Sequence, residues 1–191
     1  MSEAVEHRVE QALVRPGPYP IGLAAVLATV SMLFVAFTTA LLVRRTGSDW
    51  VPVELPAIVW LNTAVLIASS AAVELARAGL RRDDSSRTTL WLAIAGALGL
   101  LFLLGQVLAW RTLALRGVFL PSNPHAAFFY VLTALHGAHL LGGLVALGVT
   151  LRRATAGAYA SASHAGFTHA VIYWHFMGGV WLFLLAVLTT L

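Results

Sequence analysis

Residues 128–143 read FFYVLTALHGAHLLGG, and residues 173–176 read YWHF. Each stretch lies inside a long apolar run, so each is expected on a helix that crosses a membrane. Strongly polar side chains are costly inside lipid, and those found there usually have a specific partner or function. The histidines of these stretches, His136, His139 and His175, are therefore the first residues to explain.

The amino-acid composition excludes an ordinary water-soluble globule. Of the 191 residues, 59% are hydrophobic and only 10% are charged, whereas soluble domains carry about 25% charged residues. The chain has no cysteine, which excludes disulfides, iron–sulfur clusters, covalently attached haem and thiolate metal sites within it. The basic residues are all arginine and form short clusters between apolar runs. Nucleic acid is therefore not an expected partner.

Five apolar runs are long enough to span a bilayer, which takes about 20 residues each. Arginine clusters and Pro- or Gly-containing turns separate them, and no soluble domain is inserted between them. The first fifteen residues are interrupted by charges, so no cleaved signal peptide is expected. We predict an all-α, polytopic membrane protein with a polar N-terminal arm at 1–20 and one five-helix transmembrane domain at 21–191. The expected spans are 21–43, 57–76, 90–110, 126–151 and 167–191.

The arginines are distributed unevenly over the two sides of this predicted bundle. Eight fall on the side of the N-terminal arm and the second and fourth connections, and four fall on the opposite side. Because cytoplasmic loops carry the excess of basic residues, we predict a cytoplasmic N-terminus and an outside C-terminus. The eight are Arg8, Arg15, Arg77, Arg81, Arg82, Arg87, Arg152 and Arg153; the four are Arg44, Arg45, Arg111 and Arg116.

Carboxylates are confined to the first half of the chain, since no Asp or Glu follows Asp84. Ion-coupled transporters and proton pumps usually place a carboxylate near mid-membrane, so a free-standing transporter is disfavoured. Glu74 is the acidic residue expected within a span, and Arg77 follows three residues later on the same helix face. We expect these two to form a local ion pair rather than a proton carrier.

The histidines allow two interpretations. His136 and His139 are three residues apart on one helix face, and with His175 or His169 they could contribute to a metal or haem site. However, neither of their spans supplies a carboxylate to orient a ligating imidazole. We favour neutral histidines in interhelical hydrogen bonds, worth about 0.6–2 kcal/mol each. We therefore predict no catalytic, cofactor-binding or metal-binding residue. The possible partners are Asn62, Thr63, Ser69, Ser70, Gln106 and Thr133, of which Asn62 and Gln106 complete the predicted polar packing set.

In chain order, these motifs resemble subunit III of the haem–copper oxidases. Residues 61–70, LNTAVLIASS, are similar to the family's LNT…L-x-S-S element, and Gln106 followed by Trp110 is similar to its Q-x-x-x-aromatic element. Residues 128–143 resemble its FF-x-x-TG-x-HG-x-H-x-x-x-G signature, and residues 173–183 its YWHF-x-D-x-VWLF signature. The resemblance covers roughly 28–191 and points to the shorter five-helix bacterial form.

The chain departs from this family at positions where many relatives carry a carboxylate. Met32, Ala109, Thr168 and Gly178 stand at these positions. A role of those carboxylates in proton delivery is therefore not expected in this chain.

The resemblance implies a non-catalytic subunit III of a bacterial cytochrome c oxidase, which reduces O2 to water and translocates protons in aerobic respiration. Haems and copper would then lie in partner subunits I and II, with subunit I as the main contact. This multi-pass chain of the cytoplasmic (inner) membrane would bind lipid and support proton uptake and sustained turnover. Other oxidase subunits, phospholipids and a respiratory supercomplex are the implied partners. Arg153 matches a family position that helps to hold a lipid phosphate, for which plain topology signalling is the alternative explanation.

Other functions stay open at this point. The electron donor can be cytochrome c or quinol, with cytochrome c preferred. The chain could also be a subunit III-like component of a quinol oxidase or nitric oxide reductase complex. Less favoured is a small haem b-binding membrane protein that uses His136, His139 and His175.

Overall fold

The computed structural model describes residues 18–157 and 165–190. Within these ranges the chain is all-helical, and five helices are long and apolar enough to cross a membrane. The predicted all-α membrane architecture is thus confirmed, while most of the predicted polar arm lies outside the described residues. The helices are α2 (Pro18–Arg44), α3 (Ile58–Leu80), α4 (Ser85–Leu115), α5 (Pro124–Thr155) and α6 (Ala165–Thr190).

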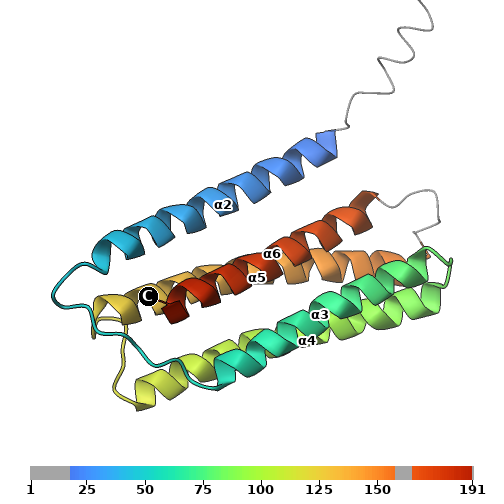
Figure 1. Cartoon of the computed structure of the whole chain (residues 1–191). Helices are drawn as coiled ribbons and strands as arrows, with labels where there is room; N and C mark the ends of the chain where they lie inside the picture. Colours follow the sequence, from blue (N-terminus) through green and yellow to red (C-terminus); the bar gives the residue numbers. More distant parts are fainter. Residues whose placement is uncertain (1–17, 158–164, 191) are drawn as a thin grey trace, which may run out of the picture.

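Four of the helices form an antiparallel bundle, and the fifth lies along its side. Helix α3 packs against α4, α4 against α5, α5 against α6, and α6 returns to α3. Helix α2 contacts α5 and α6 and runs apart from the α3–α4 pair (Figure 1). The short connections α2–α3 and α4–α5 lie at one end of the molecule, and the α3–α4 turn lies at the other.

Helices α4 and α5 begin before their predicted spans, at points where polar side chains cap their first turns. The Asp84 side chain accepts a hydrogen bond of 2.9 Å from the backbone N–H of Arg87, which starts α4. Asn123 does the same for α5, with 2.9 Å to the backbone N–H of Ala126. Such caps satisfy N–H groups that a helix start leaves open. Both helices are longer than the expected spans 90–110 and 126–151 at each end, and the caps account for the early starts.

Helix α2 begins at Pro18, inside the segment predicted as a polar arm. Proline is tolerated in the first helical turn, because the N–H groups of that turn have no partner within the helix.

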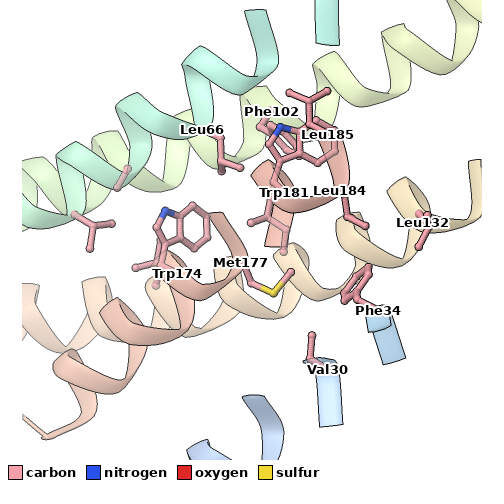
Figure 2. Close-up of a cluster of buried hydrophobic side chains, with 14 of the residues drawn as sticks. Val30, Phe34, Leu66, Phe102, Leu132, Trp174, Met177, Trp181, Leu184 and Leu185 are labelled. Atoms are coloured by element: carbon pink, nitrogen blue, oxygen red, sulfur yellow. The ribbon is translucent and has the colours of Figure 1, made fainter. Parts of the chain in front are cut away.

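Two tryptophans of α6 fill the centre of the bundle. Trp174 and Trp181 are fully buried, and Figure 2 shows both projecting from α6 toward the neighbouring helices. Trp181 meets Phe102 of α4 edge-on, with ring centroids 4.8 Å apart. Trp174 lies over Gly99, where a Cβ would come within 2.6 Å of the indole. Helix α4 therefore needs a glycine at this position to admit the ring.

The connection between α2 and α3 is held against the start of α5. His125 is buried; its Nδ1 accepts a hydrogen bond of 2.8 Å from the backbone N–H of Val53. The His125 ring also stacks on Trp50, with centroids 5.0 Å apart and planes 21° apart. These contacts fix an extended segment that has no helical hydrogen bonds of its own.

Candidate functional site

Several buried polar side chains lie close together where α3, α4, α5 and α6 meet. Trp181 donates from Nε1 to the Thr63 hydroxyl at 3.0 Å, and its ring lies 5.2 Å from the ring of His136. Asn62, next to Thr63, packs on Gly105 so closely that a Cβ there would lie 1.9 Å from the Asn62 Oδ1. This set of contacts crosses all four helices, and we call it the polar layer.

Gln106 belongs to the same layer through its place on α4. It follows Phe102 by four residues, and the Phe102 ring stands 5.7 Å from the His136 ring. It precedes Trp110 by four residues, and Trp110 donates from Nε1 to the Thr133 hydroxyl at 3.0 Å. Residues four apart share a helix face, so Gln106 faces α5 at the depth of His136. Both Gln106 and His136 are buried.

The hydroxyls of the polar layer bond to tryptophans, not to histidines. Within the described ranges, neither ring nitrogen of His136 has a hydrogen-bond partner, and the same holds for the Gln106 amide and the Asn62 Nδ2. The partners predicted for the histidines, such as Thr63 and Thr133, are taken by indole N–H groups. The prediction of direct interhelical bonds was therefore wrong for His136.

His139 turns away from the polar layer toward α2. Its Nδ1 lies 2.7 Å from the Leu135 carbonyl of its own helix, and its ring packs at 5.7 Å from the ring of Phe34 (centroid distance). The hydroxyl of Tyr173 on α6 donates to the His139 carbonyl at 3.0 Å. The imidazole bond of His139 thus lies within one helix, while its backbone helps to join α5 to α6.

His175 has a partner that sequence reasoning did not assign to it. Its Nε2 lies 2.8 Å from the Glu74 Oε1 on α3. Arg77 also approaches this carboxylate, as predicted, but its Nη1 is farther away at 3.6 Å. The spans of the histidines supply no carboxylate themselves, and the carboxylate that reaches His175 comes from another helix, α3.

The structure therefore does not bring the three histidines together. His136 lies among Phe102 and Trp181, His139 against α2, and His175 beside Glu74 on the α3–α6 face. Among residues 18–157 and 165–190, no group of three or more His, Cys, Asp or Glu side chains is placed to hold a metal ion. This arrangement does not favour the haem b or metal hypothesis.

A groove between α2, α5 and α6 contains the predicted lipid-binding residue. Its volume is about 440 Å³, and Arg153, His169 and Tyr173 supply its main polar groups. Arg153 is exposed, and its neighbour Arg152 is exposed but does not line the groove. The remaining lining is mostly apolar and comes from Leu23, Val26, Gly142, Ala146, Val149, Thr150, Gly166 and Ala170. A cation beside an apolar groove is suited to an amphiphile with an anionic head.

Two long-range hydrogen bonds were not predicted from the sequence. The bond between His125 and Val53 joins residues 72 positions apart, and the bond between His175 and Glu74 joins residues 101 apart. The only sequence signal for the first was the Pro-rich segment 50–57, whose backbone N–H groups need acceptors outside a helix. The second had a stronger signal, because Glu74 is an ionisable residue within a predicted span.

Comparisons with known proteins identify what this chain is similar to. A family model described as "Cytochrome c oxidase subunit III" matches residues 13–190. Cytochrome c oxidase subunit 3 of Thermostichus vulcanus is 35% identical over 98% of this chain and 94% of that protein. The subunit 3 protein of Synechocystis sp. is 34% identical over 85% of this chain and 71% of its own length. A probable cytochrome c oxidase subunit 3 of Mycobacterium bovis is 30% identical over 97% of this chain and 93% of that protein.

Proposed function

The chain belongs to the cytochrome c oxidase subunit III family, and from this we propose that it acts as the non-catalytic third subunit of a bacterial terminal oxidase. It is a multi-pass membrane protein and part of a haem–copper oxidase complex. In our proposal it packs on subunit I in the cytoplasmic membrane, binds phospholipid, and supports proton uptake and sustained turnover. The haems and copper that reduce O2 reside in partner subunits I and II.

The family match over residues 13–190 is the observation that carries this proposal. The geometry supports a structural role for the family's marker residues, because each histidine is already engaged by its own protein neighbours. His136 is enclosed by aromatic rings, His139 bonds to its own helix and His175 bonds to Glu74. The side chains of His136 and His175 contact neighbouring helices, which supports a role of the chain in giving shape and contact surface to the complex.

Purification of the native complex tests the assignment. The tagged chain, extracted in a mild detergent, should co-purify with a subunit that carries haem and copper. The optical spectrum of the complex should show haem, whereas the chain separated from its partners should show no Soret band. Recovery of the chain without any haem–copper subunit would contradict the proposal, and a Soret band from the isolated chain would revive the haem b alternative.

Lipid binding is proposed for the groove that Arg153 lines. The guanidinium would pair with a phosphate while the apolar walls take up acyl chains. Substitution of Arg153→Ala should lower the amount of phospholipid retained by the purified complex. Arg152→Ala is the matched control, because Arg152 is also exposed but lies outside the lining. Equal phospholipid retention by the two variants would argue against this site.

A further inference from the structure

An ionisable cluster lies on the outer face of the bundle, where α3 meets α6. Glu74 of α3 contacts His175 of α6 at 2.8 Å and Arg77 at 3.6 Å. The three side chains are not enclosed: they remain 48%, 38% and 37% exposed, in that order. The cluster therefore faces whatever surrounds the bundle on this side.

The surroundings of this cluster are at membrane depth. Glu74 lies six residues before the end of α3 at Leu80, which is about 9 Å at 1.5 Å per residue. The 23 residues of α3 span about 35 Å, only slightly more than the hydrocarbon thickness of about 30 Å. His175 lies ten residues into α6, about 15 Å from its start. Both side chains thus fall several ångströms inside the hydrocarbon.

Lipid is a poor neighbour for these groups. A charged side chain at mid-membrane costs about 2.5–3.5 kcal/mol even on the lowest scales, and ionisable residues in spans almost always face protein or a water-filled cavity. Arg77 has a long side chain that can reach the interface. The Glu74 side chain is shorter and bonds to His175, which lies deeper in the span, so its carboxylate cannot reach the interface. The cluster is better satisfied by protein than by acyl chains.

The same face carries a groove next to the cluster. A groove of about 280 Å³ runs beside His175 and is lined by Thr63, Leu66, Ile67, Ser70, Gly178 and Gly179 among others. Gly178 lies opposite Ser70, where a Cβ would be 3.4 Å from the hydroxyl, and a Cβ on Gly179 would meet nothing within 4 Å. Small residues of this kind let helix backbones approach closely in membranes.

We propose that this α3–α6 groove seats a transmembrane helix of another oxidase subunit, which donates a hydrogen bond to Glu74. The identity of the partner as an oxidase subunit rests on the proposed function. Within the described residues, both contacts of the carboxylate go to Oε1, which leaves Oε2 for a donor from outside. An Arg, Lys, Trp or His side chain of the partner has the required chemistry.

The opposite side of the bundle provides a comparison. A larger groove of about 620 Å³ lies between α4 and α5, and its lining is apolar throughout, including Leu100, Val145 and Gly148. Acyl chains can cover such a surface without loss. The two grooves therefore differ in the feature that selects a protein neighbour, which is the ionisable cluster.

Site-specific photocrosslinking within the intact complex tests the inference. A photoreactive benzoylphenylalanine replaces Leu182 at the α3–α6 groove or Val145 at the α4–α5 groove; both are exposed. Illumination should join position 182 to another oxidase subunit and position 145 to lipid. Lipid adducts alone at position 182, or equal protein yields at both positions, would overturn the inference. Either result leaves the proposed function intact, since that fails only if no haem–copper subunit co-purifies.

The role of Glu74 is tested on the same background. Glu74→Leu should lower the crosslinking yield at position 182 by about threefold or more, the equivalent of one interhelical hydrogen bond in a membrane. Glu74→Gln, which still accepts a hydrogen bond, should restore part of that yield. The yield is normalised to folded chain, so general destabilisation does not mimic the effect. An unchanged yield in Glu74→Leu would show that the cluster only ties α3 to α6.

Discussion

His136 and His139 are three residues apart, yet their surroundings differ sharply. His136 is fully buried, with Phe102 edge-on at 5.7 Å and Trp181 at 5.2 Å. His139 is half-buried, and its imidazole bonds to a carbonyl of its own helix. The volume of the His136 ring therefore fills space between three helices, whereas the His139 ring contributes mainly to one contact with α2.

This difference predicts unequal costs of truncation. His136→Ala should lower the free energy of unfolding by about 2–4 kcal/mol, because it opens a cavity among rigid aromatic rings. His139→Ala should cost about 1 kcal/mol or less. Unfolding of the detergent-solubilised chain by increasing sodium dodecyl sulfate, followed by tryptophan fluorescence, measures both. A cost for His139→Ala equal to that for His136→Ala would contradict this description of the core.

Arg44, the last residue of α2, forms an ion pair with Asp49 of the following connection, with Nη1 2.8 Å from Oδ1. The hydrogen bond from Arg44 lowers the pKa of the Asp49 carboxyl below its usual value. Because this pKa is lower in the folded state, the pair stabilises the fold fully at pH values above the ordinary aspartate pKa. That stabilisation is lost as the pH falls through the lowered pKa. Arg44→Gln should raise the Asp49 pKa toward its usual value, as followed by ¹³C NMR of the carboxyl. An unchanged pKa would show that the pair does not persist in solution.

At the scale of helices, α3 and α4 are joined more closely than any other pair. Gly105 makes this possible, because the Asn62 side chain occupies the place where a Cβ would stand. Asn62 is itself buried and short, so it has little freedom to move aside. The close approach of these two helices therefore depends on one glycine and one asparagine.

Gly105→Ala should separate α3 from α4 and cost about 1–3 kcal/mol in stability, the usual range for overpacking. Gly96→Ala on the same helix is the matched control, since a Cβ there meets nothing within 4 Å. The double variant Gly105→Ala with Asn62→Ala should cost less than the sum of the single changes, because the clash is gone. If the costs measured by the same detergent unfolding are additive, the cost of Gly105→Ala does not come from a clash with Asn62.

The helices themselves could be predicted from the sequence, but their pairing could not. Hydropathy places each span, because about 20 apolar residues must stay together to cross lipid. The starts of α4 and α5 depended on the caps at Asp84 and Asn123, which extend these helices into polar sequence. The contact of His175 with Glu74 depended on which faces of α3 and α6 meet. That facing is set by side-chain packing of the whole bundle, and a single sequence does not display it.

At the scale of the molecule, the arginines gather at the two ends of the bundle. The α3–α4 turn and the end of α5 lie at one end, and the α2–α3 and α4–α5 connections lie at the other (Figure 1). Arg81, Arg82 and Arg152 therefore mark the end toward which the Arg153 groove and the Glu74 cluster are displaced. If basic loops face the cytoplasm, both proposed contact sites lie in the cytoplasmic half of the membrane.

The orientation in the membrane can be measured with single introduced cysteines, because the chain has no cysteine of its own that would react with the label. Ser48 and Ser86 are exposed and lie in or beside connections at opposite ends of the bundle. A membrane-impermeant maleimide added to intact cells, with the outer envelope opened where one exists, should label Ser48→Cys. It should label Ser86→Cys only after the cytoplasmic membrane is made permeable. This result follows because, among the arginines that the structure describes, six lie toward the end of Ser86 and four toward the end of Ser48, and basic loops are retained in the cytoplasm. The reverse pattern would place the Arg153 groove and the Glu74 cluster in the outer half of the membrane, contrary to the orientation predicted from the arginines.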